Sequence, residues 1–250
     1  MIGALALVHE RALILQVFAY GDTSKILKLL CENHGVRTVI AKGARRPRGR
    51  FGGLLEPFTE GDVQFSLKEG REMHTLSGFD LTRGRQSLGR NLVAFAGASL
   101  LAELALRFGT DEPQTELFGL VSRKLDRLGS VAADAAPGVA FAGVWQVISL
   151  LGYEPRLDAC VGCGREISPG EATRFDIEAG GVAGVECRPE GRLIDAQTRM
   201  EVAAMCAGDA PQSEATDWRL HRSLLRAFVS SHLTQEHPLR SLDLFLDLLP

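Results

Sequence analysis

The sequence predicts an α+β protein in which a small five-stranded β-barrel precedes an all-α domain with a small cysteine-containing insert. Two observations predict this fold class. Strand-like runs separated by turn signals fill the first eighty residues, and apolar residues at helical spacing dominate from residue 90 onward. We therefore expect one domain over residues 1–82 and a second over residues 83–250, with the insert at 155–193.

The barrel is predicted from five short runs that are rich in residues favouring extended backbone, with no long helix among them. Turn signals such as Gly21-Asp22 and Glu69-Gly70 separate neighbouring runs. A closed or nearly closed sheet hides the edges of so many strands, and the five-stranded OB barrel has this size. The runs are residues 12–20, 25–33, 36–43, 62–70 and 71–80.

Alternation within the second run predicts which of its side chains face the barrel interior. Successive side chains of a strand point to opposite faces. One face therefore holds Leu27, Leu29 and Cys31, and the other holds Ile26, Lys28 and Leu30. The apolar face is the one that we expect to line the core.

Six segments of the second domain have apolar residues at helical spacing. Asn91 is positioned to cap the first of them, and Gly109 and Gly129 to end the first and the second. We interpret Trp145, Phe228 and Leu233 as core residues, because a periodic apolar stripe normally faces the interior; a groove for a partner peptide is the alternative. The segments are residues 91–108, 114–129, 138–151, 195–208, 217–233 and 239–250.

The charge of the chain is divided unevenly along its length. The 250 residues are 45% hydrophobic and 24% charged, which is typical of a globular protein. Residues 1–90 hold fourteen lysines and arginines against nine acidic residues and so carry +5, although the whole chain carries −3. A basic first part on an acidic remainder indicates a polyanion site confined to one domain.

Nothing in the sequence indicates secretion or contact with a membrane. The N-terminus is apolar but lacks a basic start and reaches charged residues early, unlike a signal peptide. The most apolar window, residues 138–153, is shorter than the ~20 residues of a membrane helix. The five cysteines include Cys31 and Cys206 in apolar runs typical of core. This usage fits a reducing cytoplasm better than a disulfide framework.

The strongest candidate binding site is the loop AKGARRPRGRF at residues 41–51. It places five cations in nine positions, and its glycines and Pro47 favour a loop from which they fan outward. Guanidinium groups bind phosphates and stack on bases, and Phe51 is predicted to serve as a stacking platform. A solvated loop without a partner is the alternative, but the small barrel and its basic charge favour nucleic-acid binding. The predicted DNA-binding residues are Lys42, Arg45, Arg46, Arg48 and Arg50, with Lys25, Lys28 and Arg37 extending the basic face.

A second candidate site begins at Cys160 and Cys163, which are spaced as one half of a zinc ribbon and are followed by Cys187. The second half departs from C-x-x-C, because Glu190 stands at its last position. Three interpretations remain open. Glu190 is the fourth ligand of one structural zinc ion, or Cys206 or a distant histidine completes the site, or the insert holds no metal. A redox role for the first two cysteines is a weaker option, because no βαβ pattern surrounds them.

No motif indicates an enzyme. The chain has no Walker A loop, no G-x-G-x-x-G and no G-x-S-x-G. Its six histidines are scattered, and its acidic residues form no nuclease-like cluster. We therefore expect neither catalysis nor a nucleotide cofactor.

Several stretches of the chain resemble the RecO family of bacterial recombination mediators. The most specific are YGDT at residues 20–23, the loop AKGARRPRGR with the following LLEPF, and LGYEPRLDACVGCG at residues 151–164; SHLTQEHPLRSL is also similar. The resemblance spans nearly the whole chain in the same order. It implies an N-terminal OB barrel, a helical domain and often a zinc-binding insert with a second C-x-x-C, from which this chain departs at Glu190.

The resemblance also implies a function in DNA repair and recombination at the nucleoid. It implies binding to single- and double-stranded DNA, annealing of complementary strands, and cooperation with RecR in loading RecA onto DNA coated by single-strand-binding protein. The residues by themselves leave other classes open, of which a nuclease or other hydrolase is disfavoured by the missing carboxylate cluster, and two others remain. One is a zinc-ribbon nucleic-acid-binding factor of transcription or translation, and the other is a protein–protein adaptor whose basic loop meets an acidic partner.

Overall fold

The computed structural model describes residues 5–51, 53–68, 70–187, 190–211, 216–234 and 238–249. Contacts divide the chain into two compact units, one of residues 1–90 and 101–130 and the other of residues 91–100 and 131–250. The predicted boundary after residue 82 stays a prediction. No helix formed by the described residues combines the length and the hydropathy that crossing a bilayer requires.

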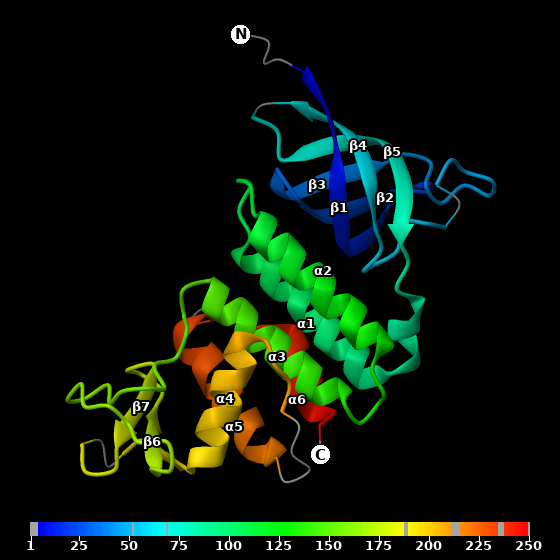
Figure 1. The fold of residues 1–250 in the computed structure, drawn as a ribbon. Helices are drawn as coiled ribbons and strands as arrows, with labels where there is room; N and C mark the ends of the chain where they lie inside the picture. Colours follow the sequence, from blue (N-terminus) through cyan, green and yellow to red (C-terminus); the bar gives the residue numbers. More distant parts are fainter. Residues whose placement is uncertain are drawn as a thin grey trace. The chain divides into compact units, whose positions relative to one another are not determined.

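The first unit contains the predicted five-stranded barrel (Figure 1). Its strands follow the order β1-β2-β3-β5-β4 in a closed sheet, and all neighbouring strands are antiparallel except β3 and β5. β1 pairs with both β2 and β4 and is therefore the longest strand. The predicted barrel is confirmed. The strands are β1 Leu5–Tyr20, β2 Ser24–Cys31, β3 Gly35–Ala41, β4 Glu60–Lys68 and β5 Met73–Arg83.

The interior of the barrel is lined by the face of β2 that alternation predicts. Leu27, Leu29 and Cys31 are fully buried in the core cluster. Leu30 on the opposite face is also fully buried, as is its cross-strand neighbour Leu13. Alternation does not show this second burial, because it depends on what covers the outside of the sheet.

The described residues form the six predicted helices and one short 3-10 segment. The side-chain oxygen of Asn91 accepts a hydrogen bond from the backbone N–H of Val93 at 3.0 Å, which confirms the predicted cap of α1. α2 ends at Ser130, one residue beyond the predicted stop at Gly129. The elements are η1 Gln86–Arg90, α1 Leu92–Phe108, α2 Thr115–Ser130, α3 Ala136–Leu150, α4 Ala196–Ala207, α5 Trp218–His232 and α6 Arg240–Asp247.

The turn between β2 and β3 packs directly against the backbone that joins α1 to α2. The backbone N–H of Val36 donates to the carbonyl oxygen of Thr110 at 2.7 Å. A Cβ at Gly35 would lie 2.2 Å from the same oxygen, and Gly35 has a φ of +58°. Only glycine fits this position, because a side chain would be both strained and in collision with the backbone.

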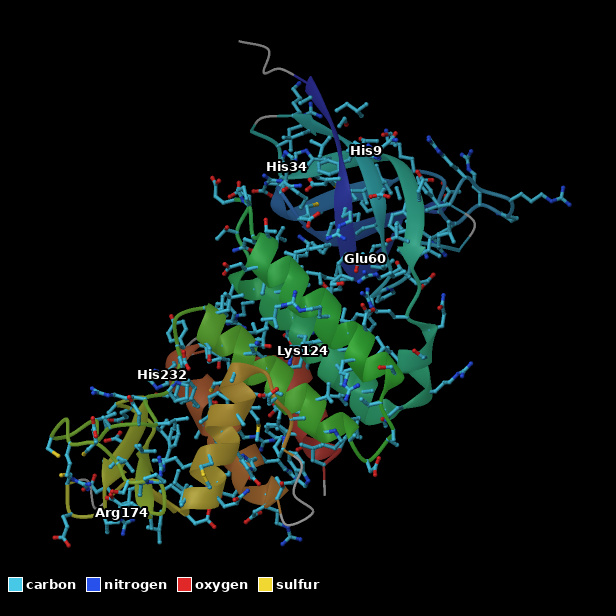
Figure 2. The ribbon with its side chains drawn as sticks, in the orientation of Figure 1. His9, His34, Glu60, Lys124, Arg174 and His232 are labelled. Carbon is cyan, nitrogen blue, oxygen red and sulfur yellow. The ribbon has the colours of Figure 1, made fainter. Side chains whose placement is uncertain are left out.

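A buried charge network joins β4 and β5 to α2. The guanidinium of Arg85 donates to the carboxylate of Glu60 at 2.8 Å and to Asp126 at 2.7 Å, and Ser122 completes the network. Both Arg85 and Glu60 are almost fully buried, with side chains 3% and 2% exposed. Figure 2 labels Glu60 at the barrel end of this network. Buried charges are stable only when they are paired in this way.

Aromatic rings form the core of the second unit. Trp145 of α3 and Phe228 of α5 lie with ring centroids 5.1 Å apart, and Phe141 packs 5.4 Å from Phe245 of α6. Trp145, Phe228 and Leu233 are all buried, which confirms that they are core residues rather than an open groove.

The cysteine-containing insert carries a small three-stranded sheet in the order β7-β6-β8. The strands are β6 Thr173–Asp176, β7 Gly181–Gly184 and β8 Arg192–Ile194. Phe175 of β6 lies 6.1 Å from the ring of Phe228 in α5. The buried guanidinium of Arg199 donates to carbonyl oxygens of the insert, those of Leu157, Ser168 and Pro169. These contacts hold the predicted insert on α4 and α5.

Candidate nucleic-acid interface and metal site

The cationic loop that follows β3 is a series of tight turns. The backbone N–H of Arg46 donates to the carbonyl of Gly43 at 3.1 Å, and that of Gly49 donates to the carbonyl of Arg46 at 2.9 Å. A Cβ at Gly49 would lie 2.8 Å from the Gly43 oxygen. Arg48 has a φ of +59°, a conformation that only a tight turn imposes on a residue with a side chain. The loop therefore has a definite shape without a partner.

The loop is fastened to the turn between β1 and β2. The backbone N–H of Arg45 donates to the carbonyl of Thr23 at 2.8 Å, and its guanidinium donates to the carbonyl of Gly21 at 3.1 Å. These two bonds place the loop directly beside the end of β1.

The cations of the loop point away from the barrel. In Figure 2 nitrogen-tipped side chains extend outward from the segment that follows β3. All five predicted loop cations are exposed. Among the described residues, Lys42, Arg46, Arg48 and Arg50 make no side-chain hydrogen bond or ion pair. The loop thus presents a dense group of unneutralised positive charges.

Phe51 does not serve as the predicted stacking platform. It is only 4% exposed and belongs to the core cluster of the barrel, so its ring is unavailable to a base. The prediction was wrong because the aromatic residue that ends the loop turns inward to fill the barrel. The guanidinium of Arg50 lies 6.0 Å from the centre of its ring.

The three strand cations that were predicted to extend the basic face all have internal partners. Lys25 donates to the carbonyl of Leu55 and to the carboxylate of Glu56, both at 2.9 Å. Arg37 donates to the carbonyl of Asp111 at 2.6 Å, and Lys28 donates to the hydroxyl of Thr38 at 2.8 Å. Their role in DNA binding stays a prediction. Glu56 and Asp111 partly neutralise Lys25 and Arg37, whereas the partner of Lys28 is an uncharged hydroxyl.

The three cysteines of the insert lie together. The Sγ atoms of Cys160, Cys163 and Cys187 all lie within 4.8 Å of one another, and Cys163 and Cys187 are 3.6 Å apart. Four sulfurs around zinc at ~2.3 Å are ~3.8 Å apart, so this spacing suits one shared ion. All five cysteines are free thiols. The described cysteines could therefore hold a metal ion.

Backbone amides prepare Cys160 to act as a thiolate. Burial opposes ionisation, but the N–H groups of Gly184, Cys163 and Gly162 donate to the sulfur and lower its pKa to about 6. The backbone nitrogen of Gly184, at the end of β7, lies 3.4 Å from the sulfur of Cys160. Amide donors around a sulfur are the arrangement that favours the charged form, which is the form that binds metal.

Comparison with known proteins assigns both parts of the chain to one family. Residues 5–85 match the family model described as Recombination protein O N terminal, and residues 89–243 match Recombination protein O C terminal. The chain belongs to the RecO family. It is 34% identical over 241 residues to the DNA repair protein RecO of Myxococcus xanthus, covering 94% of this chain and 95% of that relative. It is 31% identical over 243 residues to the DNA repair protein RecO of Rubrobacter xylanophilus, covering 94% of each.

The family assignment confirms the resemblance of the sequence to RecO proteins. It makes this chain a DNA repair protein of the RecO family, with the OB-type barrel and the helical domain that the sequence predicts.

The cluster that the described residues form supplies three possible metal ligands, all of them cysteines. Glu190 lies within the described residues but is not part of the cluster, and its role as fourth ligand stays a prediction. It lines one cavity of about 620 Å³ together with Cys187 and Arg192. Cys206 is likewise outside the cluster; it is buried in α4, where desolvation raises its pKa to about 11, as expected of a core thiol.

Two exposed aromatic side chains beside the loop were missed in the sequence. Phe18 and Tyr20 lie near the end of β1 and are 44% and 49% exposed. Alternation around the inward-facing Val17 is the signal that could have indicated them.

Proposed function

We propose that this RecO-family protein is a recombination mediator that works without covalent chemistry at the nucleoid. It binds single- and double-stranded DNA, anneals complementary strands and, with RecR, helps to load RecA onto DNA coated by single-strand-binding protein. The observation that carries the proposal is the loop of residues 42–50, whose cations are exposed and whose shape is fixed. The names of its relatives, DNA repair protein RecO, support it.

The loop acts by neutralising phosphates. Two DNA strands repel each other through their backbones, and a cation between them lowers that repulsion and releases condensed counterions. Arginine suits this task because its planar fork grips phosphate oxygens in pairs. The four loop arginines can therefore hold either one strand or two strands during pairing, without reading their sequence.

Replacing Arg45, Arg46, Arg48 and Arg50 together by alanine tests the proposal. We expect DNA affinity to fall for all sequences alike, and annealing of complementary oligonucleotides to slow. The slope of log affinity against log salt should flatten by as much as ~3 for single strands, because each phosphate contact contributes ~0.7. Fluorescence anisotropy at several salt concentrations measures both quantities.

A control variant removes the same charge elsewhere. It replaces four exposed arginines outside the loop by alanine and should retain most of the salt slope: Arg90, Arg123, Arg127 and Arg219. If the loop variant keeps the parental slope, or if both variants lose it equally, the loop is not the DNA site. Stimulation of RecA on coated single strands, with and without RecR, then tests the mediator role itself.

We also propose that the three cysteines and Glu190 hold one structural zinc ion. The ion would fix the two halves of the insert to each other, since Cys160 and Cys163 come from one turn and Cys187 from another. Elemental analysis of purified protein should give about one zinc per chain. Glu190→Cys should bind zinc more tightly in competition with a chelator, and Cys163→Ser should lose it. A metal-free protein whose Glu190→Cys variant also stays metal-free would contradict the proposal.

A further inference from the structure

The outer face of the barrel beside the cationic loop carries two solvent-exposed aromatic side chains, Phe18 and Tyr20. Val17 packs against the barrel core, so its neighbours Phe18 and Gln16 point to the opposite face of β1. Tyr20 shares that outer face two residues further on. Large exposed aromatic residues side by side on one strand are a costly arrangement for a face that meets only water.

The strands next to β1 continue this face. Phe18 lies opposite Ile26 of β2, and Ile26 lies opposite Ile40 of β3. Lys28 belongs to the same face, because it pairs with Gln16 in the register and donates to the hydroxyl of Thr38 on β3. A shallow surface of aromatic, aliphatic and hydroxyl groups thus spans three strands, with one cation at its side.

The cationic loop borders this surface directly. Arg45 donates to the carbonyl of Gly21, the residue that follows Tyr20, and its backbone N–H donates to Thr23 in the same turn. Lys42 follows the last residue of β3. Rings and cations therefore lie next to each other on one side of the first unit, and the hydrogen bonds of the loop hold them there.

We propose that Phe18 and Tyr20 are a stacking platform for the bases of single-stranded DNA, while the loop holds its phosphates. The inference rests on the proposed DNA binding and deepens it, because stacking requires unpaired bases. Single strands are the occupant that the surface fits: flat apolar rings match bases, and the adjoining positive charge matches a backbone of phosphates. The loop alone binds both forms of DNA; the rings add a preference for the single strand.

Two residues on one face of a strand are ~6.6 Å apart along it, since each residue advances ~3.3 Å. The two rings can thus receive two bases of one strand rather than a single base from both sides. Duplex DNA cannot use the platform, because its bases are stacked on one another. Stacking also tolerates any base, so the platform gives no sequence preference.

Replacing Phe18 and Tyr20 by alanine should weaken binding to a single-stranded oligothymidine by roughly thirtyfold or more, as the loss of two stacked bases predicts. Binding to a duplex of the same length should change less than twofold, and the salt slope should stay parental. Leu7→Ala with Leu81→Ala removes two exposed apolar side chains elsewhere on the barrel and serves as the control. Circular dichroism and the urea midpoint show whether the ring variant remains folded.

Phe18→Trp gives a second, direct measurement. Addition of oligothymidine should quench the fluorescence of the new indole, because a base stacks on it. Phe18→Trp should retain most of the parental single-strand affinity, because it keeps an aromatic ring at this position. The parent protein, whose Trp145 and Trp218 lie in the second unit, supplies the background. Full single-strand affinity in the ring variant, or no quenching of the new tryptophan, overturns the platform.

The outcomes separate this inference from the function on which it rests. The ring variant is the double alanine variant of Phe18 and Tyr20, and the loop variant lacks the four loop arginines. If the ring variant binds single strands normally while the loop variant loses its salt slope, the platform is wrong and the proposed DNA binding is supported. If neither variant changes binding, both fall. Self-association of the parent that disappears in the ring variant, with single-strand affinity unchanged, would assign the face to a second copy of the chain and overturn the platform.

Discussion

The first unit contains two groups of arginines whose surroundings are opposite. Arg48 and its neighbours in the loop are exposed and without ion pairs among the described residues. Arg85 is almost wholly buried, with its guanidinium divided between Glu60, Asp126 and Ser122. The difference teaches that positive charge in a basic domain has two uses. A charge with an internal partner stabilises the fold, and a charge without one is available to a ligand.

Arg85→Ala should have the largest effect, and the effect should be on folding. Removing the guanidinium deprives the buried Glu60 of its closest ion-pair partner and leaves it the hydroxyl of Ser122 and Arg83 at 3.9 Å, which costs about 3–5 kcal/mol of unfolding free energy. Urea unfolding measures the loss. Arg83→Ala is the matched control, because Arg83 is half-exposed and pairs with the same two carboxylates, Asp126 at 3.0 Å and Glu60 at the longer distance of 3.9 Å. It should cost less than about 1 kcal/mol. If Arg85→Ala and Arg83→Ala lose equal unfolding free energy, burial does not make the Arg85 ion pairs more important for stability than exposed ones.

Arg37→Ala tests the intermediate case, a predicted DNA-binding residue that has an internal partner. Its side chain is 17% exposed and contacts Asp111, so its loss should lower the unfolding free energy by about 1–2 kcal/mol. The salt slope of DNA binding should hardly change. Arg48→Ala should do the reverse, with the slope reduced by ~0.7 and stability retained. If the salt slope of DNA binding falls as much in Arg37→Ala as in Arg48→Ala, Arg37 contacts DNA despite its internal partner.

Replacing Asp195 should have the smallest effect on the unfolding free energy. Asp195 is a carboxylate with an internal partner, so it extends the comparison from positive to negative charges. It caps α4 by accepting the backbone N–H of Thr198 at 2.8 Å, and these hydrogen bonds lower its pKa. Asp195→Ala should cost about 1 kcal/mol at pH 7.

The contribution of the charged cap depends on pH in a defined direction. A lowered pKa in the folded protein means that the stabilisation is present above the ordinary carboxyl pKa of ~3.9. It is lost as the pH falls through the lower, folded value. The difference between parent and Asp195→Ala should therefore shrink in acid. Asp195→Asn keeps the acceptor and cannot titrate, so its stability should not show this loss; a parallel loss in Asp195→Asn would contradict the assignment.

Local patterns in the sequence were sufficient for the strands, the helices and the grouping of the cysteines. Alternation places Leu27 and Leu29 inside the barrel, capping residues such as Asn91 mark helix ends, and the C-x-x-C spacing brings two thiolates together. Each of these depends on neighbours within a few positions of the chain.

What the sequence did not reveal depends on residues that are distant in the chain. Arg37 meets Asp111, which lies 74 positions away, and no local pattern predicts that contact. Phe51 and Phe18 are both aromatic residues in the basic domain, yet one fills the core and the other faces outward. Their directions are set by the turns and the register of the barrel, which the composition of a segment does not contain.

The charge network at the base of the barrel has a consequence for the order in which the protein is made. Glu60 and Arg85 leave the ribosome well before Ser122 and Asp126, to which they are joined in the finished structure. During that interval Glu60 and Arg85 can pair with each other, but Ser122 and Asp126, which complete the network, have not yet been synthesised. A chain truncated near residue 100 and released from the ribosome should therefore be more open to protease between β4 and η1 than one truncated after α2.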